Sequence, residues 1–216
     1  GCYQFRVTRN SDLYVESEEV EDLMQAVEGQ LIASRYGEAV RLEVAHNCPK
    51  EHVDFLLEMF ELDEQDLYRV DGPVNLNRLV AVYAMTGRDD LRYLPFVPGQ
   101  QKAMLAADDI FAAISNGDIL LHHPYESFSP VIDFFARASE DPDVHAIKLT
   151  LYRTGAESPI VDALVRAAQA GKEVTVSIEL RARFDEAANI KLANRLQEAG
   201  AHVVYGVVGY KTHCKL

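Results

Sequence analysis

The strongest constraint on the fold is an alternation of strand and helix patterns between residues 146 and 207. Short apolar runs rich in β-branched residues, at 146–152, 174–180 and 203–207, are separated by two stretches with helical spacing of apolar side chains. Such alternation is typical of repeated βαβ units and a parallel sheet. We therefore predict an α/β domain here, in the order strand, helix, strand, helix, strand.

The two predicted helices have recognisable ends. The first follows Ser158, an N-cap residue, with Pro159 at the first helical position, and it stops at Gly171. The second begins near Asp185 and stops at Gly200. Their predicted apolar faces consist of Val161, Leu164, Val165 and Ala168 in the first helix and Ala188, Leu192, Leu196 and Ala199 in the second.

Cationic side chains follow two of the predicted strands. Arg153 directly follows the first strand, and Arg183 comes shortly after the second, next to the start of a helix. Ligands of open parallel sheets bind beyond the carboxyl ends of the strands, and helix N-termini attract anions. A lone arginine at a strand end is usually only solvated, but two at matching positions weaken that interpretation. We predict that both arginines and His213 converge on one phosphate-sized ligand, because the guanidinium fork matches phosphate oxygens.

Five sequence blocks carry a resemblance to a known family. Three lie in the α/β region and read LTLYRTG (149–155), ELRARFDEAANI (179–190) and GYKTHCKL (209–216). Two lie upstream and read FRVTRNSDLYV (5–15) and GDILLHHPYESFSPV (117–131). Together, and in this order, they closely resemble the bacterial polyphosphate kinase family. The resemblance covers nearly the whole chain.

The resemblance implies an ATP:polyphosphate phosphotransferase that moves the γ-phosphate of ATP reversibly to inorganic polyphosphate through a phosphohistidine, with Mg²⁺ as cofactor. The family's phosphorylated histidine corresponds to His213, and the two arginines of its magnesium-nucleotide site correspond to Arg153 and Arg183. A guanidinium has only donors. We therefore expect both arginines to hold phosphate or water rather than to ligate the metal directly.

The sequence His213-x-Lys215 also resembles the start of the histidine-lysine motif of the phospholipase D superfamily. This likeness adds Lys215 as a second cation beside the phosphate and implies a phospholipase D-like catalytic fold. The family's second histidine and adenine-contacting residues have no counterpart in this chain. The resemblance thus implies a truncated catalytic domain and a fragment that is inactive alone.

The fold class that we expect is α/β, with a small α+β domain followed by a mainly parallel, phospholipase D-like domain. Residues 1–100 are predicted to form the partial head-like domain with its linker, and residues 101–216 the catalytic part. Pro95, Pro98 and Gly99 interrupt helical periodicity at this boundary.

Further elements are predicted by the same patterns. In the first domain we expect strands at 4–8, 39–45 and 68–70, and helices at 17–36, after Pro49, and around Leu76, Leu79, Val80 and Tyr83. In the second domain we expect a first strand at 119–122, followed by a helix with an apolar face of Phe128, Val131, Ile132 and Phe135.

Several other residues that could carry chemistry are better explained as structural. His46, Cys48 and His52 lie close together, but their spacing matches no paired zinc-ligand pattern. Cys214 is expected to pack on the face opposite His213 in an alternating strand. The remaining candidates that we assign to structure are His122, His123, His145, His202 and the acidic cluster Glu18, Glu19, Glu21 and Asp22, and we assign no role to Tyr125.

The charge is unevenly divided along the chain. The net charge is −13, yet residues 1–100 hold 9 basic and 19 acidic side chains whereas residues 144–216 hold 10 and 7. This balance argues against nonspecific nucleic-acid binding, while the last third can attract a polyanion locally. Three scattered cysteines predict a reducing, cytoplasmic setting. The resemblance adds a homo-oligomer, dimer or tetramer, that can associate peripherally with membranes.

Two other functions are compatible with the motifs. One is a phospholipase D-superfamily hydrolase or phosphatidyltransferase, which passes the phosphoryl group to water or an alcohol. The other is a non-catalytic module that binds polyanions. The block ELRARFDEAANI favours the kinase over the hydrolase, and dependence on ATP distinguishes these two. The intact Arg153, Arg183 and His213 argue against the binding module, which binding without phosphotransfer would support.

Overall fold

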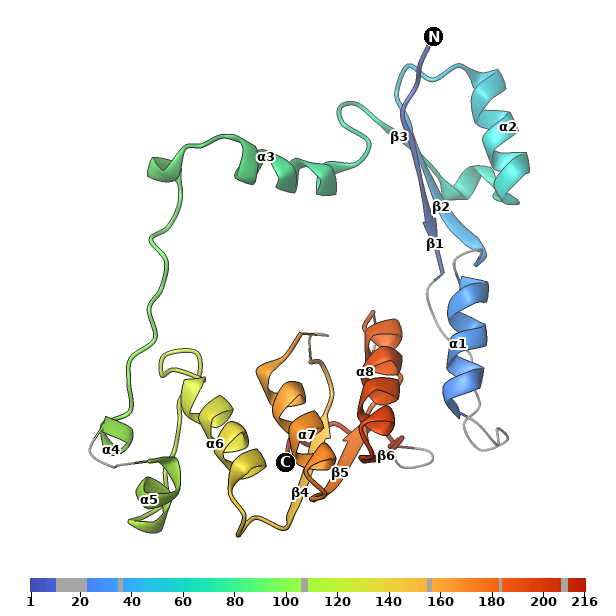
Figure 1. Ribbon diagram of the computed structural model, residues 1–216. Coiled ribbons are helices and arrows are strands. Elements are labelled where there is room, and N and C mark those ends of the chain that lie inside the picture. The colour runs from blue at the N-terminus through green and yellow to red at the C-terminus, as the bar shows by residue number, and fades with distance from the viewer. Residues whose placement is uncertain (11–22, 35–36, 106–108, 155–156, 183, 207–209) are drawn as a thin grey trace. The chain divides into compact units, whose positions relative to one another are not determined.

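The computed structural model describes residues 1–10, 23–34, 37–105, 109–154, 157–182, 184–206 and 210–216 (Figure 1). The contacts among them divide the chain into two compact units, and the later division falls between Leu94 and Pro95. Helix α1 (Leu23–Ser34) is split between the units, since its residues up to Glu28 group with the second unit. The predicted limits of this helix, at 17 and 36, lie outside the described residues.

The first unit contains a small mixed sheet. Its strands are β1 (Phe5–Arg9), β2 (Ala39–Ala45) and β3 (Leu67–Val70), with β1 antiparallel and β3 parallel to the central β2. Helix α2 (Lys50–Phe60) packs its apolar side against this sheet. The buried cluster consists of Leu42, Val44, Cys48, Val53, Leu56 and Leu57. These elements confirm the strands and the helix predicted for this region.

A helical segment follows at the predicted place, but its apolar side chains do not form a core. A 3₁₀ turn (Leu76–Leu79) leads into the short helix α3 (Val80–Met85). The four side chains that marked this helix in the sequence are between 50% and 70% exposed: Leu76, Leu79, Val80 and Tyr83. Helical spacing of apolar residues therefore located the helix without identifying what packs against it.

The second unit begins with three helices, α4 (Lys102–Leu105), α5 (Ile110–Ser115) and α6 (Ser129–Glu140). The sequence patterns predicted only α6. Helix α5 is capped by Asp109, whose side chain accepts a hydrogen bond from the N–H of Ala112 at 2.8 Å. Such N-caps satisfy a backbone donor that the helix itself leaves unpaired.

The strand predicted at 119–122 is wrong. This stretch forms no strand, and Leu120 is 84% exposed. The backbone groups of His122 are used locally, because its N–H donates to the Glu126 carboxylate at 2.7 Å and its carbonyl accepts from the Glu126 N–H at 2.9 Å. A short apolar run thus resembled a strand in a place where the backbone forms a turn.

A three-stranded, all-parallel sheet forms the rest of the second unit. Its order is β4 (Ala146–Leu151), β5 (Glu173–Ile178) and β6 (His202–Val204), connected by helices α7 (Pro159–Gln169) and α8 (Glu186–Glu198). The order strand, helix, strand, helix, strand is the one predicted. Of the predicted third strand, residue 207 lies outside the described residues.

The ends of the two crossover helices also confirm the prediction. Ser158 occupies the N-cap position of α7, and Asp185 occupies that of α8. Past the last turns, Gly171 and Gly200 adopt φ values of +85° and +94°. Glycine suits these positions because a Cβ disfavours a left-handed backbone.

One face of the parallel sheet packs against helices. Helix α6 lies beside α7, and α7 lies beside α8, where Asp162 of α7 pairs with Arg195 of α8 at 2.7 Å (Figure 1). The strand residues that alternate onto the buried face are Ile147, Leu149, Leu151, Val174, Val176 and Ile178. Those on the other face are partly or fully exposed: Lys148, Thr150, Thr175 and Ser177. No helix among the described residues has the length and apolar character that membrane crossing requires.

Candidate functional site

The carboxyl ends of β4 and β5 are held together by one side chain of helix α8. Asn189 is 1% exposed, and its Nδ2 donates to the carbonyl oxygen of Tyr152 at 2.9 Å and to that of Glu179 at 2.8 Å. Both carbonyls belong to residues just beyond the strands. The amide of Asn189 therefore fixes the edge at which parallel sheets bind ligands.

The ring of Tyr152 is the centre of the candidate site. The imidazole of His213 meets it edge-on, with ring centroids 4.9 Å apart and an interplanar angle of 78°. Nζ of Lys215 lies 4.3 Å from the ring centroid, and Cζ of Arg153 lies 5.6 Å from it. The negative face of an aromatic ring attracts such cations. Three of the four predicted site residues thus converge on one tyrosine.

Arg153 also contacts the start of helix α8. Its Nε lies 2.7 Å from a carboxylate oxygen of Asp185, the N-cap residue of that helix, and both side chains are about half exposed. Arg153 thus lies beside a helix N-terminus, although this is the N-terminus of α8 and not that of α7, the helix that follows Arg153 in sequence. Arg183, the other predicted arginine, lies outside the described residues.

The segment that carries His213 is bound to the sheet at both ends. The N–H of Thr212 donates to the carboxylate of Glu179 at 2.8 Å. At the other end, Leu216 and Thr150 of β4 exchange two hydrogen bonds, each 2.9 Å long. Between these anchors Nζ of Lys215 donates to the carbonyl of His213 at 2.6 Å. The imidazole is presented at an exposed position on a restrained backbone.

The prediction for Cys214 is wrong. Residues 211–216 do not form a strand, and the Cys214 side chain is exposed rather than packed. The segment follows β4 through contacts centred on Thr150 instead of a regular ladder. Strand alternation therefore does not determine which way its side chains point.

The other histidines of the second unit lie apart from this cluster in the described structure. His145 immediately precedes β4 and His202 begins β6, so both occupy the amino-terminal edge of the sheet, as predicted. His123 contacts the carbonyl of Glu126 through Nδ1 at 3.0 Å, within the local turn before α6. Among the described residues no group of three or more His, Cys, Asp and Glu side chains could hold a metal ion.

Sequence reasoning missed three residues of the site, Tyr152, Glu179 and Asn189. Tyr152 was visible as the neighbour of Arg153, but nothing in the sequence showed that other side chains meet its ring. Asn189 carried a usable signal, since it is a polar residue directly before Ile190 on the apolar side of a predicted helix. Buried polar groups require partners, and such a position therefore predicts a specific hydrogen bond.

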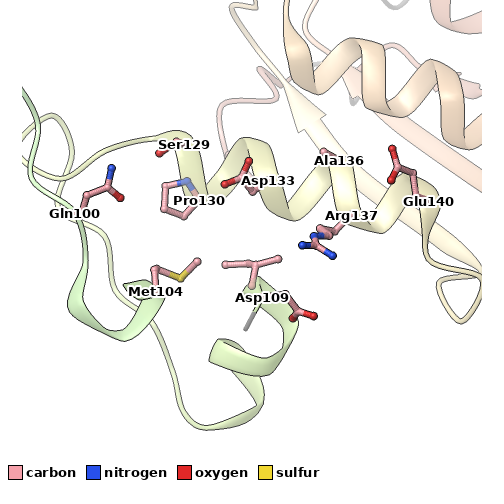
Figure 2. Close-up of a pocket in the computed structure, with 10 residues that line it drawn as sticks. Gln100, Met104, Asp109, Ser129, Pro130, Asp133, Ala136, Arg137 and Glu140 are labelled. Carbon is pink, nitrogen blue, oxygen red and sulfur yellow. The ribbon is translucent and has the colours of Figure 1, made fainter. Parts of the chain in front are cut away.

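A separate cavity of about 430 Å³ lies in the second unit between α5 and α6 (Figure 2). Its lining includes Met104, Asp109, Asp133, Arg137 and Glu140, and none of the predicted site residues. This cavity is therefore distinct from the cluster on Tyr152 and does not identify the site.

The fold and the cluster define an α/β protein with an imidazole and cations at the carboxyl edge of a parallel sheet. Comparison with known families agrees with this class. Residues 1–82 match the polyphosphate kinase middle domain, and residues 109–216 match polyphosphate kinase C-terminal domain 1. The chain belongs to the polyphosphate kinase family.

Individual relatives give the same result over the whole chain. The chain is 58% identical to a polyphosphate kinase of Pseudomonas putida and 56% identical to one of Pseudomonas aeruginosa, over 216 residues in each case. It covers 30% and 31% of those proteins. The crystal structure of polyphosphate kinase from Porphyromonas gingivalis matches 99% of the chain with a TM-score of 0.73 at 29% identity, and the chain covers 29% of it. The chain thus spans about 30% of the length of its relatives.

Proposed function

We propose that this chain contributes the phosphohistidine part of a polyphosphate kinase active site, in which His213 receives the γ-phosphate of ATP and passes it to inorganic polyphosphate. The observation that carries the proposal is the convergence of His213, Lys215 and Arg153 on Tyr152. The names of the relatives and the family match support the choice of substrates. Residues 101–216 then form the first part of a phospholipase D-like catalytic domain, and residues 1–100 the head-like domain and linker.

The chemistry of the first step follows from the residues present. The unprotonated imidazole nitrogen of His213 forms a bond to the γ-phosphorus, while the bond from that phosphorus to the β–γ bridging oxygen breaks and ADP leaves. The transferred group resembles metaphosphate, so charge neutralisation and positioning matter more than covalent assistance. Arg153 and Lys215 supply fixed positive charge beside the imidazole, and the proposal extends this role to Arg183.

The second step reverses the bonding on a different acceptor. The terminal phosphate of polyphosphate attacks the phosphorus, the P–N bond breaks, and the polymer becomes one phosphate longer. Because each step is reversible, the same residues form ATP from ADP and polymer. His213 returns to its unprotonated state with no net change in the protein.

The cluster does not fit Mg²⁺ as a direct ligand set. Mg²⁺ takes oxygen ligands, whereas Arg153 and Lys215 offer only donors. Both oxygens of the nearby Glu179 accept backbone N–H groups, and Asp185 is paired with Arg153. The two cations instead fit phosphate oxygens, so we propose that any Mg²⁺ arrives with the nucleotide and contacts the phosphates.

The wider properties of the enzyme belong to the same proposal. A cytoplasmic homo-oligomer, dimer or tetramer, with peripheral membrane association, is the setting that the family resemblance suggests. None of these properties depends on a residue of the Tyr152 cluster. Localisation, oligomeric state and membrane association can therefore be tested independently of phosphotransfer.

The test uses a chimeric enzyme in which this chain replaces the matching segment of the Pseudomonas aeruginosa polyphosphate kinase. We call this chimera the exchange enzyme. Its melting curve should match that of the unmodified Pseudomonas enzyme, which shows that it is folded. With γ-labelled ATP and Mg²⁺, the exchange enzyme should then incorporate label into acid-insoluble polymer. Label released only as inorganic phosphate would favour the hydrolase. Polymer binding without any transfer would favour the binding module, and either result would overturn the proposal.

A further inference from the structure

Glu179 is a buried carboxylate at the end of β5. The residue is 4% exposed, and each of its two carboxylate oxygens accepts one backbone N–H. Oε1 accepts from Arg181 at 3.0 Å, and Oε2 accepts from Thr212 at 2.8 Å. Burying a carboxylate is costly unless it is hydrogen-bonded, and hydrogen bonds to an ionised acceptor are stronger than neutral ones. These two hydrogen bonds therefore offset the cost of burying a carboxylate at this position.

The two bonds connect parts of the chain that are distant in sequence. Arg181 is two residues from Glu179, but Thr212 is 33 residues away and directly precedes His213. The junction is tightly packed, because a Cβ at Gly206 would lie 3.2 Å from Oγ1 of Thr212 and 4.0 Å from Oε2 of Glu179. Three segments of the chain thus meet at this carboxylate.

We propose that Glu179 is a positioning residue for His213, and this inference rests on the proposed phosphohistidine function. Its carboxylate holds the N–H of Thr212, the residue immediately before the histidine, and so fixes the imidazole against the ring of Tyr152. Both carboxylate oxygens are committed to backbone donors. Glu179 therefore acts through the backbone of Thr212, and not as an acid or base on the imidazole.

The informative variant is Glu179→Gln. Glutamine keeps the length of the side chain, but it has one acceptor oxygen, and its amide nitrogen cannot accept an N–H. One of the two backbone donors must therefore lose its partner. Glu186→Gln is the matched control, since Glu186 is also a buried carboxylate, 8% exposed, in the first turn of α8. If Glu179→Gln does not fold, Glu179→Asp replaces it, because aspartate keeps the charge but shortens the reach by one methylene.

The first measurement is the rate of protein labelling by γ-labelled ATP in a single turnover of the exchange enzyme. A nucleophile misplaced by about 1 Å can lose roughly 100-fold in rate. We expect Glu179→Gln to lower the maximal labelling rate by about 10- to 100-fold, with the ATP concentration for half-maximal rate unchanged. Glu186→Gln should label like the parent. Equal labelling by Glu179→Gln and Glu186→Gln would overturn the proposal.

The second measurement follows amide hydrogen exchange at Thr212 in the 216-residue chain itself. Loss of the carboxylate acceptor should accelerate exchange at Thr212 in Glu179→Gln and leave it unchanged in Glu186→Gln. An unchanged rate in both variants would contradict the anchoring role. If the parent exchange enzyme takes no label at all, the proposed function fails. The rates of amide hydrogen exchange at Thr212 still decide whether Glu179 anchors the backbone before His213.

Discussion

Tyr152 shows how one residue can organise a site without supplying chemistry. The imidazole of His213 and the cationic groups of Lys215 and Arg153 all contact its ring. Two like charges near one another repel, and the attraction of each cation to the aromatic ring offsets part of that cost. The ring is thus expected to set the orientation of the histidine and the spacing of the two cations.

Replacing Tyr152 separates the role of the ring from that of its hydroxyl. Tyr152→Phe keeps the ring and should label His213 within about twofold of the parent. Tyr152→Ala removes contacts that are worth about 1 kcal/mol at such sites, and the labelling rate of the exchange enzyme should fall by roughly fivefold or more. Equal rates for the alanine and phenylalanine variants would show that the ring does not position His213.

At this scale the sequence revealed the residues that carry charge but not those that place them. Arg153 was predictable because it directly follows a strand, whereas His213 and Lys215 were assigned through the family resemblance. Glu179 and Asn189 act across 33 and 37 residues of sequence. Such pairs depend on how strand ends and loops meet in space, and no local pattern identifies both partners.

At the scale of elements, the βαβ segment was predicted well and the stretch at 119–122 was not. Between residues 146 and 204, β-branched runs, helical spacing and terminal glycines all indicate the same structure. At 119–122 only a short apolar run was available, and the neighbouring Glu126 bonds both backbone groups of His122 instead. Agreement among independent local signals, rather than hydrophobicity alone, made the difference.

The less buried face of the parallel sheet is a second finding at this scale. Parallel sheets are normally covered on both faces and have nearly continuous apolar strands. Here the strands alternate, with Ile147, Leu149 and Leu151 buried but Lys148 and Thr150 at least partly exposed. Alternation of buried and exposed residues is more typical of antiparallel sheets. The intervening helices, and not the strand pattern, therefore identify this sheet as parallel.

Asn189 should contribute to stability through both strand ends. In Asn189→Ala, the carbonyls of Tyr152 and Glu179 each lose a buried hydrogen bond, and an unsatisfied buried polar group costs about 1–3 kcal/mol. We expect the free energy of unfolding of the 216-residue chain, measured in urea, to fall by about 2 kcal/mol or more. Asn194→Ala, in the same helix but only partly buried, is the control and should change it by less than about 0.5 kcal/mol. Similar losses in both variants would contradict this account of Asn189.

At the scale of the whole molecule, the distribution of charge matches the proposed substrates. The chain carries a net charge of −13, yet the segment 144–216, which contains the cluster on Tyr152, has more basic than acidic side chains. A polyanion is attracted to such a local excess of positive charge even on an acidic protein. Association with polyphosphate should accordingly weaken as salt screens these charges.

The most direct test of the central claim is whether His213 becomes phosphorylated. The exchange enzyme is incubated with γ-labelled ATP and Mg²⁺, and the protein-bound label is tested for acid lability and base stability. We predict acid-labile, base-stable label in the parent and in His202→Ala, a control histidine at the opposite edge of the sheet, and none in a folded His213→Ala variant. Equal label in His213→Ala and the parent would place the nucleophile elsewhere and contradict the site described here.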